Sequence, residues 1–282
     1  MKKILVPTDF SDNAYSALCY AAKLYSGEVL QITILHSFSD EIDKLTSRVD
    51  IGRSETMREK FYKQYDDEGE QLLEKLKQDA PKQKHTFDVI NTPATLAKSI
   101  NSLVASDGYD LVVMGSKGRT AAEEVLMGST TASIVKTLDA CPLLIVPEQV
   151  EFSMPTSIAF ASDFNEFYPL SKLKPVTRLV RQYNSRLNIV HVGSEADLEK
   201  NQNQNLEKFE NDLTEYEAEF YFVPKKDTIS KTLYTFMDEK SIDLFVLIYH
   251  KHNFIKQLFR EPVVSRVGKH TYIPTLVIPQ NY

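Results

Sequence analysis

The chain carries the same four apolar landmarks twice, in the same order. The pairs are ILVPTDF (4–10) with IAFASDF (158–164), ITILH (32–36) with LNIVH (187–191), YDLVVM (109–114) with IDLFVL (242–247), and PLLIVP (142–147) with PTLVIP (274–279). The period is about 130 to 155 residues, which is the size of a domain and too long for a solenoid repeat. We therefore predict two tandem domains, residues 1–149 and 150–282.

Within each half, short β-branched runs alternate with segments of helical spacing. The runs at residues 111–114 and 143–146 are apolar throughout, as is typical of parallel strands that helices cover on both faces. Apolar residues between 14 and 25 recur at intervals of three and four, which predicts a helix that Ser11, Asp12 or Asn13 caps. The pattern predicts an α/β fold in which each domain has a sheet of about five parallel strands between helices.

Three polar segments stand outside this pattern. Residues 53–78 are helix-prone and have no counterpart of that length in the second half, so we interpret them as an insertion and a partner-specific surface. The run NQNQN at 201–205 predicts a loop before a helix at residues 206–216. His250 and His252 share one face of an extended segment, but no acidic or cysteine partner lies at ligand spacing, so we expect no metal site.

Composition excludes several classes of function. The formal net charge of −6 gives no reason to expect nucleic-acid binding, although a local basic patch stays open, and no apolar run approaches the length that spans a bilayer. The N-terminus leads straight into a strand-like run without the pattern of a signal peptide, so we expect a cytoplasmic protein. Cys19 and Cys141 form no motif, and we interpret both as buried thiols in a reducing compartment.

Three of the chain's 9 glycines, Gly115, Gly118 and Gly128, lie in the stretch MGSKGRTAAEEVLMGST at residues 114–130. This loop follows an apolar strand, and ligands of open parallel sheets bind beyond the carboxyl ends of strands. Glycine lets backbone N–H groups approach a phosphate, and the helix that begins at Ser129 offers unpaired N–H donors to an anion. Alternatively, the glycines only shape turns, because their spacing is neither the P-loop nor the dinucleotide fingerprint.

The spacing G-x-x-G-x₉-G-S resembles the ATP-binding signature of the universal stress protein family. The opening ILVPTDFS is similar to the first strand and turn of that family, and CPLLIVP at 141–147 is similar to its last strand. The resemblance covers the first half end to end and the second half more weakly. It implies five-stranded parallel sheets of the adenine nucleotide alpha hydrolase-like kind. It also implies that the first domain binds ATP or another adenine nucleotide, together with Mg²⁺.

By this resemblance, Asp9 sits at the adenosine end of the site, and Leu35 and His36 flank the base. The full set of implied nucleotide-binding residues is Pro7, Thr8, Asp9, Leu35, His36, Gly115, Ser116, Lys117, Gly118, Arg119, Gly128, Ser129 and Thr130. Two alternatives stay open: Asp9 caps the first helix, and His36 is a structural residue at the end of a strand. We expect no catalytic residue.

The second half lacks the glycine loop. Ile248 stands where Gly115 does, and Arg260 or Glu261 stands near the position of Gly128. Bulky side chains there would fill the space of a triphosphate, so we expect this degenerate domain to bind no ATP in the manner of the family. The two last strands are expected to pair as an internal pseudo-dimer, with a homodimer as a further possibility.

The resulting hypothesis is an ATP-binding regulatory protein of the stress response, with unknown protein partners. No residue is placed to orient a water at the γ-phosphate, so we expect no dedicated hydrolysis of ATP, and slow ATPase activity stays open as an alternative. One alternative is an interaction module that binds no nucleotide. Another is an adenylating enzyme, although residues 7–11 offer no glycine-serine loop after the first strand.

Overall fold

A computed structural model of the chain describes residues 2–25, 27–46, 51–79, 84–118, 127–148, 150–250 and 273–282. The chain divides into two compact units, Met1–Phe152 and Ser153–Tyr282. Each unit is an α/β fold built on parallel strands, as the sequence predicts. Among the described residues, no helix combines the length and apolar character that crossing a bilayer requires.

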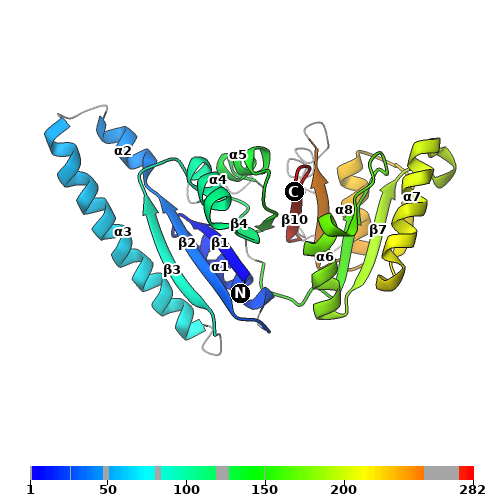
Figure 1. Ribbon diagram of the computed structural model, residues 1–282, viewed down its shortest axis with the longest axis horizontal. Coiled ribbons are helices and arrows are strands. Elements are labelled where there is room, and N and C mark those ends of the chain that lie inside the picture. Colours follow the sequence, from blue (N-terminus) through cyan, green and yellow to red (C-terminus); the bar gives the residue numbers. More distant parts are fainter. Residues whose placement is uncertain are drawn as a thin grey trace. The chain divides into compact units, whose positions relative to one another are not determined.

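The first unit places its strands in the order β3-β2-β1-β4-β5, all parallel (Figure 1). Helix α1 packs against β1, β4 and β5, while α4 packs against α5 and α3 against β3. The elements are β1 (Lys2–Thr8), α1 (Asp12–Leu24), β2 (Leu30–Ser37), α2 (Ser39–Thr46), α3 (Ile51–Asp79), β3 (Thr86–Thr92), α4 (Leu96–Asp107), β4 (Leu111–Gly115), α5 (Ser129–Thr137) and β5 (Leu143–Val146).

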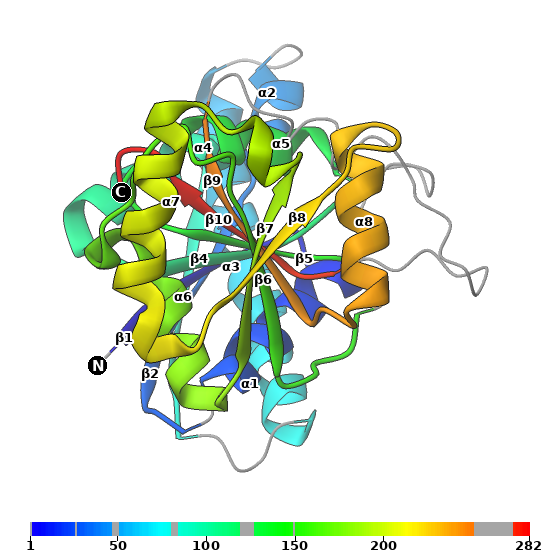
Figure 2. The ribbon, with the colours of Figure 1, turned by 90° about the vertical axis from the view of Figure 1, so that its right-hand side faces the viewer.

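The second unit repeats this topology with the order β10-β9-β6-β7-β8. Its sheet lies between α6 and α7 on one side and α8 on the other (Figure 2). The elements are β6 (Ser157–Ala161), α6 (Leu170–Tyr183), β7 (Arg186–Val192), the 3₁₀ turn η1 (Glu195–Asp197), α7 (Lys200–Leu213), the 3₁₀ turn η2 (Thr214–Tyr216), β8 (Glu219–Val223), α8 (Ile229–Glu239), β9 (Leu244–Tyr249) and β10 (Thr275–Pro279).

Strand registers match the two units residue by residue. Ile4 pairs with Ile32 on one side and Leu111 on the other. Its counterpart Ile158 pairs with Leu187 and Leu244. These are the residues that the repeated landmarks align, so the sequence repeat is also a repeat of hydrogen-bonded rungs.

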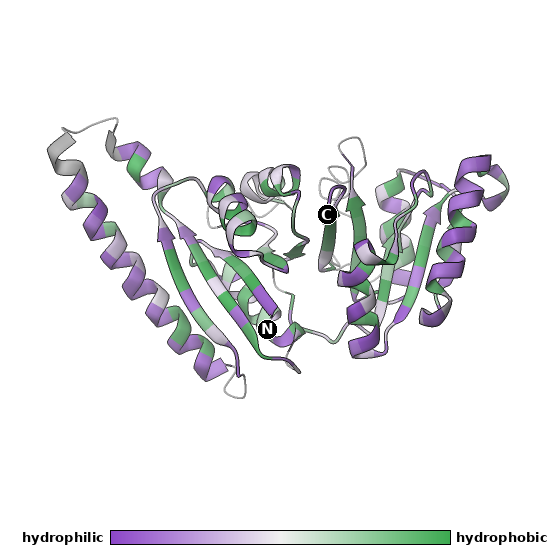
Figure 3. Ribbon diagram, viewed as in Figure 1, coloured by the Kyte–Doolittle hydropathy of each residue, from purple (hydrophilic) through white to green (hydrophobic). Residues whose placement is uncertain are grey.

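Hydrophobic strands form the centre of each unit, whereas α3 is hydrophilic along most of its length (Figure 3). Helix α3 lies between β2 and β3, just as α7 lies between β7 and β8. The segment 53–78 is therefore a longer form of an element that both units have, and our interpretation of it as an insertion is corrected. The equivalence of α3 and α7 is hard to recognise in the sequence because the two helices differ in length, with 29 and 14 residues.

The NQNQN run belongs to helix α7, and the predicted loop is wrong. The helix begins at Lys200, behind a capping box formed by Glu199 and Gln202. The amide groups of the run donate to three consecutive main-chain carbonyls of the turn after β6. The bonds are Asn201 Nδ2 to Asn165 O (3.2 Å), Gln202 Nε2 to Asp163 O (2.7 Å) and Asn205 Nδ2 to Phe164 O (2.9 Å). We call these three bonds the amide clamp.

The two cysteines are free thiols, but only one is buried as expected. Cys141 is buried, and burial raises its pKa to about 12. Cys19 is partly exposed on α1, which corrects the expectation of two buried thiols. Burial also raises the pKa of the Cys19 thiol, so the protonated form of both cysteines is favoured.

Candidate functional site

The strand order of the first unit reverses between β1 and β4. A reversal of this kind opens a crevice at the carboxyl ends of the two strands, where ligands of open α/β sheets bind. Pro7 and Thr8 end β1, and Gly115 ends β4, so the topology brings these residues to the same edge. The elements that the sequence predicted to form the site do converge there.

The turn after β1 is held by its own side chains. Phe10 adopts a left-handed backbone conformation, with φ at 59°, which is strained for a residue with a side chain. The Thr8 hydroxyl accepts from Phe10 N at 3.0 Å, and Asp9 Oδ1 accepts from Ser11 N at 3.1 Å. The Ser11 hydroxyl caps α1 by accepting from Ala14 N, so Asp9 is not the N-cap of that helix.

The three glycines let the loop pack against the protein. A Cβ on Gly118 would lie 2.7 Å from Asp9 Oδ2, and one on Gly115 would lie 2.8 Å from Asn13 Nδ2. A Cβ on Gly128 would lie 3.3 Å from Lys117 Cα. Protein atoms fill the space on the Cβ side of each glycine, so contacts within the protein explain why these positions lack side chains.

Asn13 is the residue of this region that sequence reasoning missed. Its Nδ2 donates to Lys117 O at 2.7 Å, which ties the loop after β4 to the first turn of α1. The side chain is only 5% exposed, and Oδ1 has no hydrogen-bond partner among the described residues. The sequence does indicate this residue, because Asn13 is a polar residue on the buried face of α1. From the sequence, however, we expect Asn13 only as a possible capping residue of that helix.

The loop reaches the first turn of α5 through main-chain bonds. Ser116 N donates to Val146 O and Gly128 N donates to Ser116 O, so these two N–H groups are engaged within the protein. The next residues, Ser129 and Thr130, are exposed in the first turn of α5, whose N-cap Gly128 provides no side-chain bond. The first N–H groups of a helix have no acceptor within it, so this turn has the donors and the dipole that suit an anion.

Lys117 carries the positive charge of the loop, and it is already paired. Its Nζ lies 2.6 Å from Glu148 Oε2, and its side chain is 10% exposed. A phosphate at the α5 turn would therefore share this ammonium group with Glu148. Arg119, the other predicted cation, lies outside the described residues.

The expected base end is aromatic and largely buried. Leu35 is fully buried in the core, whereas His36 is 7% exposed and donates from Nδ1 to Thr8 O at 2.9 Å. The His36 ring lies 4.8 Å from the ring of Phe10 and 4.2 Å from that of Tyr65, between centroids. Burial lowers the pKa of His36 below its ordinary value of 6.5, so the neutral ring is favoured.

The second unit keeps the turn after its first strand. Phe164 is left-handed with φ at 55°, Asn165 N donates to Asp163 Oδ1 at 3.0 Å, and His191 Nδ1 donates to Ser162 O at 3.0 Å. At the end of β9, however, Ile248 takes the register position of Gly115 and is 4% exposed. Arg260 and Glu261 lie outside the described residues, as does His252.

His250 forms protein contacts at the carboxyl end of β9. Its Nε2 lies 2.5 Å from the Tyr168 hydroxyl, and its Nδ1 lies 3.8 Å from Glu166 Oε1. Within the described ranges, no group of three His, Cys, Asp or Glu side chains is arranged to hold a metal ion.

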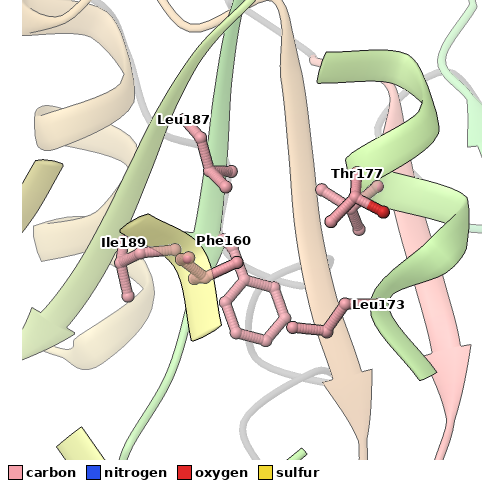
Figure 4. Close-up of a pocket in the computed structure, with 7 residues that line it drawn as sticks. Phe160, Leu173, Thr177, Leu187 and Ile189 are labelled. Carbon is pink, nitrogen blue, oxygen red and sulfur yellow. The ribbon is translucent and has the colours of Figure 1, made fainter. Parts of the chain in front are cut away.

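A small pocket of the second unit is apolar. Figure 4 shows Phe160, Leu187 and Ile189 of the sheet facing Leu173 and Thr177 of α6. The Thr177 hydroxyl donates to Lys174 O, so it is engaged within its own helix. Such a lining lacks the charged and donor groups that a phosphate requires.

The family model and the relatives found by sequence agree on one family. The model of the universal stress protein family matches residues 1–147. Two universal stress proteins of Methanocaldococcus jannaschii are 27% identical over 153 residues and 30% identical over 151 residues. Each match covers 51% of this chain, with 94% and 81% of the respective relative. A universal stress protein of Bacillus subtilis is 28% identical over 145 residues, which cover 51% of this chain and 97% of the relative.

Solved structures resemble the chain over nearly its whole length. A universal stress protein from Archaeoglobus fulgidus covers 98% of this chain and 96% of its own, with a TM-score of 0.67 and 20% identity. A putative universal stress protein from Pseudomonas aeruginosa covers 100% and 94%, with a TM-score of 0.56 and 12% identity. At such identities the likeness concerns the fold, and it extends to the second unit.

Proposed function

The chain belongs to the universal stress protein family, and from this premise we propose that its first unit binds an adenine nucleotide, ATP or a close relative. The protein is of the stress-response type, and we propose that it acts in the cytoplasm as a nucleotide-dependent regulator. The observation that carries the proposal is the convergence of Asp9, Gly118 and the first turn of α5 at one sheet edge.

The proposed site follows the reversal between β1 and β4. The phosphates lie at the first turn of α5, where Ser129 and Thr130 supply N–H and hydroxyl donors. Asp9 and the end of β1 border the adenosine, and His36 lies at the base end. Mg²⁺ arrives with the triphosphate, because in nucleotide sites this ion is held mainly by phosphate oxygens, water and one or two carboxylates.

We propose that residues 1–149 form the nucleotide-binding domain and that residues 150–282 form a degenerate copy. Ile248 supports this division, since a buried isoleucine stands on the rung that Gly115 occupies in the first unit. The degenerate domain then contributes surface for partners. ATP that binds at the two described ends of the loop after β4, Gly118 and Gly128, changes the surface that a partner meets.

A second candidate is an interaction module that binds no nucleotide. It is favoured by the packing of the glycines, since Asn13 and Asp9 by themselves explain why Gly115 and Gly118 carry no side chain. The pairing of Lys117 with Glu148 points the same way, because the Glu148 carboxylate already neutralises this ammonium group without a bound ligand.

Calorimetric titration of the full chain with ATP and Mg²⁺ separates the two candidates. The proposal expects saturable binding of one ATP per chain, with no phosphate release above the buffer rate. Gly118→Ala should weaken binding about tenfold or more, because its Cβ would displace the Asp9 carboxylate. Gly27→Ala is the matched control, since its Cβ would meet nothing within 4 Å. Absence of binding would favour the interaction module, and rapid phosphate release would indicate an enzyme.

A further inference from the structure

His36 has one ring nitrogen in use and one without a partner. Nδ1 faces the carbonyl oxygen of Thr8 at 2.9 Å, and a carbonyl only accepts, so Nδ1 carries the proton. In the neutral ring Nε2 is then a hydrogen-bond acceptor. It is buried, and among the described residues it has no hydrogen-bond partner.

A buried acceptor without a donor costs free energy, and a ligand that supplies the donor recovers it. Burial disfavours the protonated ring, so the acceptor character of Nε2 is maintained near neutral pH. The residue stands at the carboxyl end of β2, one strand away from the reversal between β1 and β4. Because Nε2 is buried and the Tyr65 ring covers His36, the base of a nucleotide whose phosphates lie at α5 reaches this atom only when the Tyr65 ring moves aside.

We propose that His36 Nε2 accepts a hydrogen bond from the exocyclic amine of adenine and thereby selects 6-amino purines over purines that lack this group. The inference rests on the proposed function and names the atom that distinguishes the bases. A purine without the amine leaves Nε2 unsatisfied. A 6-oxo purine also places a second acceptor against it, which is repulsive.

Helix α3 takes part in this recognition through Tyr65. The Tyr65 ring covers His36, with 4.2 Å between ring centroids, and it is nearly parallel to Phe10 at 6.1 Å. A purine that reaches Nε2 takes over part of this contact, so the Tyr65 ring shifts when the base binds. The aromatic side chains of Tyr65 and Phe10 then offer their faces to the base, as aromatic groups do in other base-binding sites.

The test compares ATP with purine riboside 5′-triphosphate, which lacks only the amine, in calorimetric titrations of the full chain. We expect the wild type to bind ATP about tenfold more tightly than the analogue, the effect of one hydrogen bond to a buried acceptor. The variant His36→Asn retains a donor near the position of Nδ1 for Thr8 O and removes Nε2. It should bind both nucleotides with the affinity that the wild type has for the analogue.

His191→Asn is the matched control in the second unit. His191 donates from Nδ1 to Ser162 O at 3.0 Å, as His36 does to Thr8 O, so both substitutions perturb the same kind of strand-end bond. The control should keep the tenfold preference for ATP. Equal binding of the two nucleotides by the wild type, or an unchanged preference in His36→Asn, would overturn the inference and leave the proposed function standing. Failure of the wild type to bind either nucleotide would overturn both.

Discussion

The two units share a frame and differ at the edge where the first one has its candidate site. Both have a left-handed phenylalanine after the first strand, and both tie a histidine of the second strand to that turn. The first unit then closes its edge with glycines that fit against Asp9 and Asn13. The second unit instead has a buried Ile248 and the amide clamp of α7.

This difference separates what the fold requires from what the site requires. The Asp-Phe turn persists in a unit without the glycines, so the turn belongs to the fold. The glycines appear only where the loop approaches Asp9 and Asn13 closely, so we assign them to the candidate site. In the second unit, the carbonyls of residues 163–165 accept hydrogen bonds from side-chain amides of α7. These bonds within the protein stabilise the turn after β6.

The largest effect is expected from Ile248→Gly. Removing this buried side chain from β9 leaves a cavity, and we expect a loss of about 3 to 5 kcal/mol in the free energy of unfolding. Hydrogen exchange of the β9 and β10 amides measures the loss in the second unit. Ile248→Val, as the control, should cost about 1 kcal/mol. One glycine does not create a site, so a second equivalent of bound ATP would contradict our comparison of the units.

The amide clamp gives the next largest effect. Asn205→Leu leaves Phe164 O without its donor in a buried position, and we expect a loss of about 2 kcal/mol. Asn201→Leu removes an exposed bond of the same clamp and should cost about 0.5 kcal/mol. Urea unfolding followed by circular dichroism compares the two variants. Equal costs would show that the clamp does not stabilise the turn through its buried member.

A smaller effect should follow from Glu148→Gln. This change gives the first unit the residue type that Gln280 has at the equivalent position, and it releases Lys117 from its ion pair. We expect ATP to bind about threefold more tightly at low salt, with the gain disappearing at high salt. Glu215→Gln is the control, since it removes the same charge from the pair with Arg181 in the second unit. A similar gain in both variants would show a general charge effect.

The smallest effect concerns pH and His36. Burial lowers its pKa, although the Thr8 carbonyl and the carboxylates of Glu41, Glu68 and Asp9 act in the opposite direction. A histidine whose folded pKa is depressed stabilises the fold above its unfolded pKa of 6.5, and this contribution is lost as the pH falls through the folded value. Urea unfolding at successive pH values should show a decline below pH 6.5 that is reduced in His36→Asn. Identical profiles would contradict the assignment.

The sequence predicted the fold well because strand periodicity and the internal repeat are local patterns. The helices that begin at Asp12 and Ser129 were predicted within two residues, since a capping serine and a glycine mark their starts. The failures involve partners that are distant in the chain. The NQNQN run looks like a loop until the carbonyls of residues 163–165 are placed beside it.

Only part of the candidate site could be predicted, because local patterns reveal strand ends and helix starts but not contacts between distant residues. The end of β1, the end of β4 and the start of α5 follow from strand order. The contact between Asn13 and the loop does not, because it joins residues about a hundred positions apart. The pairing of Lys117 with Glu148 was also invisible, since an isolated lysine in a loop indicates charge without indicating what neutralises it.

The common register of the two sheets has a consequence for protein engineering. The connection that leaves β4 at Gly115 enters β5 at Leu143, beside Val112, and the one that leaves β9 at Tyr249 enters β10 at Thr275, beside Phe245. The two connections thus span equivalent anchor points on equivalent rungs. We therefore expect that the connection of one unit can be exchanged for that of the other while both sheets keep their hydrogen-bond ladders.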